Sequence, residues 1–148
     1  MSSFLSGFLF ASLAGLLMAV QGSINSVLGK KVGLWEANLI VHVTGVFVLV
    51  LILFLLRVGS SGFHKLSQAP WYTFLGGLLG VMIIYGVTVS IPKLGVAIAT
   101  TAIVVAQVST ALVIDHFGLF GLEEVPFSWL KALGLVFLAI GTRLMLLK

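Results

Sequence analysis

Long apolar runs recur along this chain of 148 residues and restrict its fold severely. The run Val46–Leu56, for example, contains no polar residue. A hydrocarbon core about 30 Å thick needs roughly 20 helical residues to cross it. Membrane β-strands would alternate apolar and polar residues over about ten positions, and these runs do not alternate. Five segments are long enough to be transmembrane helices, near Phe4–Leu28, Leu34–Arg57, Trp71–Ile91, Leu94–His116 and Ser128–Leu147.

The composition excludes the other broad classes of protein. Only 8% of the residues are charged and the mean hydropathy is +1.26, whereas a soluble domain carries roughly 25% charged residues. Three prolines and no cysteine exclude collagen and disulfide scaffolds, and so much apolar surface excludes a disordered chain. We therefore expect an all-α integral membrane protein with a single transmembrane domain, 1–148, passing through a cell (inner) membrane several times.

The basic residues predict anchors at the helix ends. The net charge of +4 comes from eight Lys/Arg against four acids, and the basic residues stand singly between apolar runs. This distribution is typical of membrane helices, so no nucleic-acid partner is expected, and the lipid bilayer is the first partner. The N-terminal apolar run has no basic leader or clear cleavage site, which favours a retained first helix.

Short links join the expected helices, at Gly29–Gly33, Ser60–Pro70, Pro92-Lys93 and Gly118–Pro126, and Pro92-Lys93 is expected to form a tight turn. With five spans, one side holds Arg57, Lys65 and Lys131, and the other holds Lys30, Lys31, Lys93 and Lys148, with Arg143 one turn inside. The Lys/Arg bias that sets membrane orientation is therefore weak, with a mild preference for a cytoplasmic C-terminus.

A chain with so weak a Lys/Arg bias could insert into the membrane in both orientations. Many transporters consist of two inverted repeats with the substrate between them. One repeat with an odd number of helices gives the same arrangement as an antiparallel homodimer, or as a heterodimer with a paralogue. The alternatives are a parallel homodimer and a subunit of a larger complex.

Polar side chains inside a membrane are costly and are candidates for function. Gln21 and Asn25 lie four residues apart on one helix face, and Asn38 and His42 repeat that spacing on the second helix. Gln107 borders a stripe of small residues on the fourth helix, which would let another helix approach closely. These five residues are the candidate substrate-binding side chains. The alternative is that Gln21 and Asn25 bond only backbone carbonyls or each other.

The ionisable residues divide into candidates for proton coupling and candidates for structure. His42 is a candidate because histidine changes charge near neutral pH, although a neutral imidazole bonded to a neighbouring helix is equally ordinary. Glu36 is a second candidate, but in the first turn it can also favour its helix N-terminus. Asp115 and His116 close the fourth helix, where Asp115 is expected to cap the turn before Gly118 or to pair with a basic loop residue.

No pattern for catalysis or metal binding is visible. The chain has no P-loop, no G-x-S-x-G and no H-E-x-x-H. Its three histidines, His42, His64 and His116, lack the spacing of metal ligands. We therefore expect neither an enzyme nor a cofactor or metal site.

Several short motifs resemble the YdcZ-like branch of the drug/metabolite transporter superfamily. They are the Q-x-x-x-N of Gln21 and Asn25 followed by Leu28-Gly29, then Gly45, Leu75–Gly80, Pro92–Gly95, Gln107 and Ile114–Gly121. The resemblance covers essentially the whole chain. It implies a single five-helix repeat of a fold that elsewhere is a ten-helix inverted duplication, and small proteins that pair.

The family also resembles the four-helix small multidrug resistance exporters, whose first helix carries a central glutamate. Here the first helix has no acid, so that carboxylate mechanism is in doubt. Glu36 and His42 also depart from the commoner family pattern of small or aromatic residues.

Together these features predict a secondary active transporter for a small polar or aromatic organic solute. It would work by alternating access in an antiparallel homodimer, with a proton coupled through His42 or Glu36. The alternatives are a non-transporting membrane subunit or assembly partner, and a small ion channel.

Overall fold

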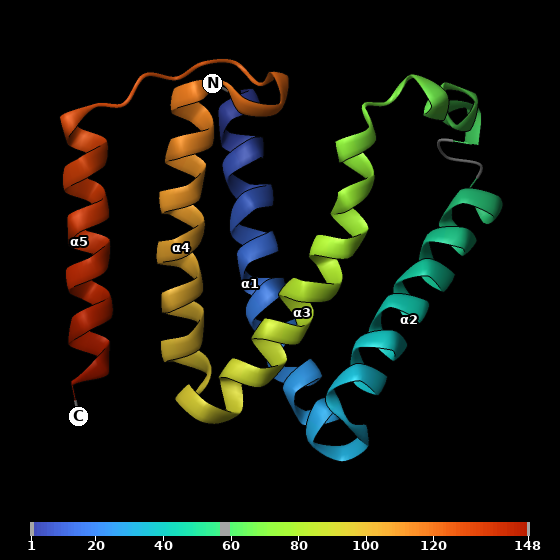
Figure 1. The fold of residues 1–148 in the computed structure, drawn as a ribbon, viewed down its shortest axis with the longest axis horizontal. Helices are drawn as coiled ribbons and strands as arrows, with labels where there is room; N and C mark the ends of the chain where they lie inside the picture. Colours follow the sequence, from blue (N-terminus) through green and yellow to red (C-terminus); the bar gives the residue numbers. More distant parts are fainter. Residues whose placement is uncertain (1, 57–59, 148) are drawn as a thin grey trace. The chain divides into compact units, whose positions relative to one another are not determined.

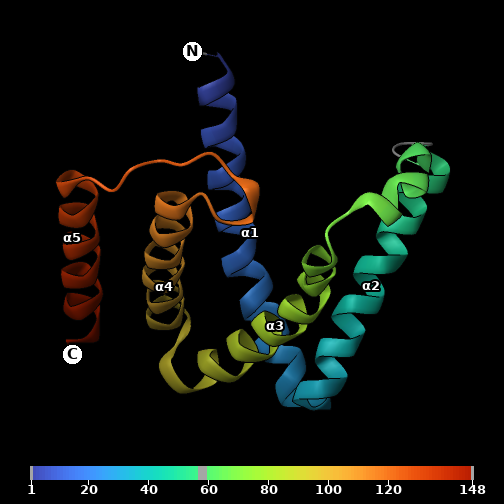
Figure 2. The same cartoon turned by 45° about the horizontal axis from the view of Figure 1, so that its top comes forward.

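A computed structural model describes residues 2–56 and 60–147. Two charges used in the orientation argument, Arg57 and Lys148, lie outside the described residues. The described part is helical throughout, with α-helices α1 (Ser2–Val32), α2 (Leu34–Leu55), α3 (Leu75–Leu94), α4 (Val96–Phe117) and α5 (Trp129–Leu146), and 3-10 helices η1 (Ser60–Gln68), η2 (Trp71–Phe74) and η3 (Leu119–Gly121). Figures 1 and 2 show the path of the chain.

Four segments are long and apolar enough to cross a membrane: Phe4–Val32, Leu34–Leu55, Trp71–Leu94 and Val96–Phe117. They match the first four predicted spans. The helix α5, with 18 residues, coincides with the fifth. Most large apolar side chains in the described part are exposed, and the buried apolar residues are Ala37, Ile91 and Ala99. Such an outward-facing apolar surface requires lipid or another apolar partner around it, so the prediction of an all-helical membrane protein is confirmed.

The links before α2 and before α4 are shorter than predicted. Helix α1 continues through Gly29–Val32. The positive charges of Lys30 and Lys31 in its last turn interact favourably with the negative end of the helix dipole. Helix α3 likewise continues through Pro92 and Lys93 to Leu94, so the expected tight turn at Pro92-Lys93 is wrong. A proline in the last turn keeps a helical φ and removes one hydrogen bond. The breaks come instead at Gly33 and Gly95, with φ of 104° and 83°, values that glycine adopts without strain.

The chain divides into two compact units, the first ending at Lys93 and the second beginning at Leu94. In the first unit, the C-terminal half of α1 passes close to α3. A Cβ at Gly22 would lie 2.8 Å from Val87 Cγ1, and one at Gly29 would lie 2.6 Å from Thr88 Cγ2. Both figures show α3 crossing this half of α1. A larger residue at either glycine would force a neighbouring side chain of α3 to move.

In the second unit, α4 and α5 run side by side in opposite directions (Figures 1 and 2). The helix α4 ends at Gly118 in the left-handed conformation, and Ser128 caps α5 by accepting a hydrogen bond from the Lys131 N–H at 3.3 Å. The connection between them is held by Asp115, whose main-chain carbonyl accepts from the Val125 N–H at 2.8 Å. A further side-chain hydrogen bond joins the two helices, from Thr101 Oγ1 of α4 to Met145 Sδ of α5 at 3.3 Å, and it is exposed.

Candidate functional site

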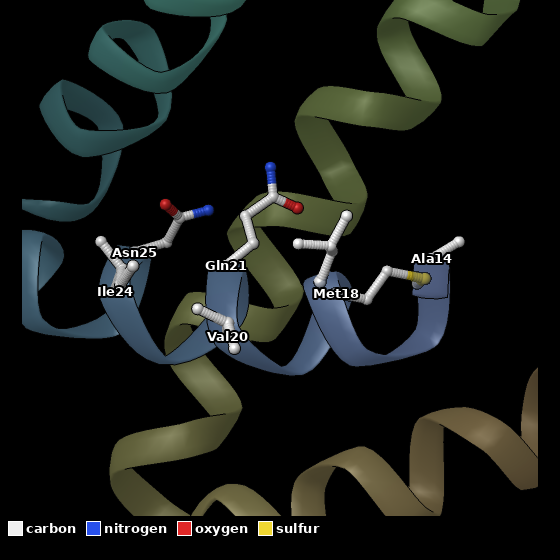
Figure 3. Close-up of a pocket in the computed structure, with 7 residues that line it drawn as sticks. Ala14, Met18, Val20, Gln21, Ile24 and Asn25 are labelled. Atoms are coloured by element: carbon white, nitrogen blue, oxygen red, sulfur yellow. The ribbon is translucent and has the colours of Figure 1, made fainter. Parts of the chain in front are cut away.

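The amides of Gln21 and Asn25 open into a hollow along one face of α1. The hollow has a volume of about 480 Å³, and Ala14, Leu17, Met18, Val20 and Ile24 complete its lining. Figure 3 shows both amides projecting from the same side of the helix. Within the described residues neither amide has a hydrogen-bond partner, although Asn25 is only 6% exposed. The two amides therefore do not bond each other or a backbone carbonyl, and both are free to bind a solute.

Asn25 lies in a buried part of α1. The next residue, Ser26, is also buried, and Thr88 of α3 is 2% exposed beside Gly29. These polar side chains surround the contact between α1, α2 and α3. A buried polar group without a partner is unfavourable. The interior of the first unit is therefore polar at a cost in free energy.

A second hollow lies between α2 and α3. It has a volume of about 200 Å³ and is lined by Trp35, Asn38, Leu39, His42 and Val81. Asn38 Nδ2 donates to the Val81 carbonyl at 2.8 Å, which ties α2 to α3. The other amide atom, Oδ1, is buried and receives no hydrogen bond from the described residues. We call this hollow the α2–α3 pocket.

His42 is fixed in the α2–α3 pocket by its own helix. Its Nδ1 lies 2.9 Å from the Asn38 carbonyl oxygen one turn earlier. Its Nε2 faces α3, where a Cβ at Gly80 would lie 3.5 Å away. The imidazole is therefore bonded through one nitrogen only, and the second nitrogen remains open toward α3.

Glu36 and Gln107 lie outside both hollows of the first unit. The Glu36 carboxylate contacts Gly33 at the start of α2, and no described residue forms an ion pair with it. This position agrees with a charge that favours the helix N-terminus. Gln107 lines a third hollow, of about 350 Å³, together with Ala106, Thr110, Ala111 and Ile114 of α4. Its exposed amide has no hydrogen-bond partner in the part of the chain that the structure describes.

The end of α4 is held by backbone and imidazole contacts. The Asp115 carboxylate neither caps the turn nor forms an ion pair with a described residue, and its main-chain carbonyl bonds the loop instead. His116 Nδ1 accepts from the Phe127 N–H at 3.3 Å, and its ring contacts Phe117 and Phe127 edge-on. These geometries agree with structural roles at this helix end.

The five candidate substrate-binding residues are thus divided among three hollows. Gln21 and Asn25 share one, Asn38 and His42 share another, and Gln107 lines the third. No group of three or more His, Cys, Asp or Glu among residues 2–56 and 60–147 could hold a metal ion.

An aromatic pair that was not predicted lies beside the α2–α3 pocket. The rings of Trp35 and Tyr85 stack with centroids 4.6 Å apart and an angle of 24° between their planes. Trp35 lies three residues before Asn38 and seven before His42, which places all three on one helix face. This spacing could have identified Trp35 from the sequence as a neighbour of Asn38 and His42. Nothing in the spacing could indicate Tyr85, because it belongs to another helix.

Four helices that are long and apolar enough to cross a membrane define the class of the chain as a multi-pass membrane protein. The chain matches, over residues 6–144, the family described as "putative inner membrane exporter, YdcZ". It belongs to that family, as its motifs predicted, and it is a multi-pass protein of the inner membrane. No curated protein and no solved structure matches the chain.

Proposed function

We propose that the protein is a secondary active transporter of a small polar or aromatic organic solute, working by alternating access in an antiparallel homodimer and catalysing no chemical reaction. The observation that carries this proposal is the pair of unpartnered amides, Gln21 and Asn25, in the α1 hollow. An amide without a partner in hydrocarbon is unfavourable, and a polar solute would satisfy it. Family membership supports transport in general.

The expected affinity suits a carrier. A hydrogen bond between side chains in a membrane contributes about 0.6–2 kcal/mol. The two amides of the α1 hollow would therefore bind a solute only modestly. A carrier needs this property, because it must release its solute on the far side. The α1 hollow also has room for a small organic molecule, since ligand pockets are typically about 300–1,000 Å³.

A second copy of the chain would complete the site. We propose that α5 is a fifth span, because 18 helical residues are about 27 Å long, close to the thickness of the hydrocarbon core. The exposed amide of Gln107 needs a polar partner at membrane depth, and the residues around it on α4 are small enough for close approach. The weak Lys/Arg bias supports an inverted second copy, and fusing a reporter to the C-terminus would test this by showing both orientations.

Flux into liposomes tests the transport proposal. Purified protein is reconstituted, and uptake of a panel of cations, amino acids and sugars is measured with and without a pH gradient. Gln21→Ala and Asn25→Ala should each reduce uptake of the transported solute to about a tenth or less, the loss of one to two such hydrogen bonds. Val20→Ala, which lines the same hollow without a hydrogen-bonding group, is the matched control and should retain uptake.

Three results would contradict the proposal. Uptake of none of the solutes would favour a non-transporting subunit, and currents too large for a carrier would indicate a channel. Failure of Gln21→Ala and Asn25→Ala to insert would make both residues structural.

A further inference from the structure

The hydrogen bonds of His42 fix which of its nitrogens carries the proton. A carbonyl oxygen can only accept, so the contact of 2.9 Å with the Asn38 carbonyl requires a hydrogen on Nδ1. In the neutral imidazole the lone pair is then on Nε2, which becomes a hydrogen-bond acceptor facing α3. When His42 is protonated, Nε2 carries a hydrogen instead and becomes a donor. The α2–α3 pocket therefore changes its chemistry with one proton.

Asn38 lines the pocket and carries a second, unpartnered acceptor. Its Nδ2 is occupied by the Val81 carbonyl at 2.8 Å, which fixes the orientation of the amide. Its Oδ1 is buried without a donor among the described residues, in a side chain that is only 3% exposed. Such an orphaned acceptor is unfavourable until a donor reaches it, and a ligand in the pocket could supply that donor.

An aromatic surface stands beside the two acceptors. Trp35 lines the pocket and stacks on Tyr85 with centroids 4.6 Å apart, so the indole is held by a second ring. The face of a tryptophan attracts a cation within about 6 Å. An ammonium group has three donors, no acceptor and a positive charge. It matches two acceptors and an aromatic face better than a carboxylate or an ether would.

We infer that the α2–α3 pocket binds the ammonium group of an organic amine while His42 is neutral, and that a proton binding to His42 Nε2 expels it. The inference rests on the proposed function and names its substrate class. Each cycle adds one proton to Nε2 on one side of the membrane and releases one ammonium cation. On the other side Nε2 loses that proton to water as the next ammonium binds. One positive charge is thus exchanged for another.

No other charge in this part of the fold faces His42. The pocket lining contributes Trp35, Asn38, Leu39 and Val81 besides the histidine, and none of these is ionisable. The remaining titratable groups of the helices packed here lie elsewhere: Glu36 contacts Gly33, Tyr85 stacks on Trp35, and Lys30, Lys31 and Lys93 are exposed in the last turns of α1 and α3. His42 is therefore the group whose charge decides whether a cation stays.

The inference is tested by measuring, with calorimetry, the binding of a probe to the full chain in lipid nanodiscs. The probe is tyramine, an aromatic amine, and the comparator is 4-ethylphenol, which has the same ring without the ammonium group. Tyramine should bind at about pH 8 and about tenfold more weakly at about pH 5.5, because a second positive charge, on protonated His42, would repel the ammonium group. The comparator should bind weakly at both pH values. Equal binding of the two compounds would overturn the amine class.

Gly80→Ala isolates the role of Nε2. The new methyl would lie 3.5 Å from Nε2, an ordinary contact that covers the nitrogen without a clash. Tyramine affinity at about pH 8 should fall about tenfold, the loss of one hydrogen bond of this kind. Gly76→Ala is the matched control one turn away on α3, because a Cβ there meets nothing within 4 Å, and it should leave the affinity unchanged. Equal affinities for the two variants would overturn the role of Nε2.

His42→Gln tests the coupling itself. Glutamine retains a hydrogen-bonding amide but does not titrate, so binding of tyramine should persist and its pH dependence should disappear. An unchanged pH profile would overturn the role of His42.

The same preparations separate this inference from the proposed function. Flux that depends on Gln21 and Asn25 but changes neither with pH nor with Gly80→Ala would overturn the inference and leave the proposed function in place. Binding of tyramine that depends on pH, without flux of any solute, would overturn transport and leave the pocket standing.

Discussion

In the first unit, four polar side chains are buried around the contact of α1, α2 and α3: Asn25, Ser26, Asn38 and Thr88. In the second unit, Ala99 is the one buried residue among those described, and the side-chain hydrogen bond between α4 and α5, from Thr101 Oγ1 to Met145 Sδ at 3.3 Å, is exposed. One hydrogen bond in the first unit, from Asn38 to Val81, joins two helices at depth. The comparable amide of the second unit, Gln107, has no partner among the described residues.

The comparison indicates that different contacts stabilise each of the two units. The first unit has close contacts at its glycines and a hydrogen bond between two helices, so contacts within the unit set how its helices pack. The second unit is a helix pair whose exposed faces are small or apolar, and its mid-helix amide remains to be satisfied from outside. We therefore expect substitutions in the first unit to affect folding and binding, and substitutions in the second to affect association.

The largest expected effect concerns the close approach at Gly29. Gly29→Val places a side chain where a Cβ already lies 2.6 Å from Thr88 Cγ2. Overpacking of this kind costs about 1–3 kcal/mol, so the free energy of unfolding in detergent should fall by that amount. Gly15→Val on the same helix meets nothing within 4 Å and serves as the control. Equal losses of stability for the two variants would show that α1 and α3 do not pack as described.

The same amide-to-leucine change in the two units should give opposite results. Asn38→Leu removes the bond to Val81 and should lower the free energy of unfolding by about 0.6–2 kcal/mol. Gln107→Leu should leave the unfolding of the monomer unchanged and weaken association of the chains by a similar amount, because its amide would bond a second copy. Unfolding in detergent and sedimentation across a concentration series would measure the two effects. A stability loss for Gln107→Leu without weaker association would remove the contrast.

The smallest expected effect lies at the beginning of α5. Ser128→Ala removes the oxygen that accepts from the Lys131 N–H, and losing such a cap costs about 0.5–1 kcal/mol at an exposed helix end. The control, Thr142→Ala in the same helix, removes a hydroxyl that only bonds back to the Leu138 carbonyl and should have less effect on unfolding. If the two variants unfold alike, the second unit does not depend on its helix ends in the way that the contacts indicate.

The membrane class, the positions of the helices and the family could all be predicted from the amino-acid sequence. Apolar runs such as Val46–Leu56 are sufficient for this, since hydrocarbon requires every backbone group to be bonded within its own helix. The motifs around Gln21, Asn25 and Gln107 indicated the family correctly. The helix ends near Gly33 and Gly95 were less predictable, because lysines and a proline that usually mark links can also be accommodated in a last turn.

The grouping of the candidate residues depends on how the helices pack. Spacing along one helix correctly paired Gln21 with Asn25 and Asn38 with His42, since residues four apart share a face. It could not indicate that Tyr85 stacks on Trp35, that Val81 accepts from Asn38, or that Gly80 leaves room beside Nε2. Those contacts join residues about 40 to 50 positions apart in the sequence, and the packing of one helix on another sets them.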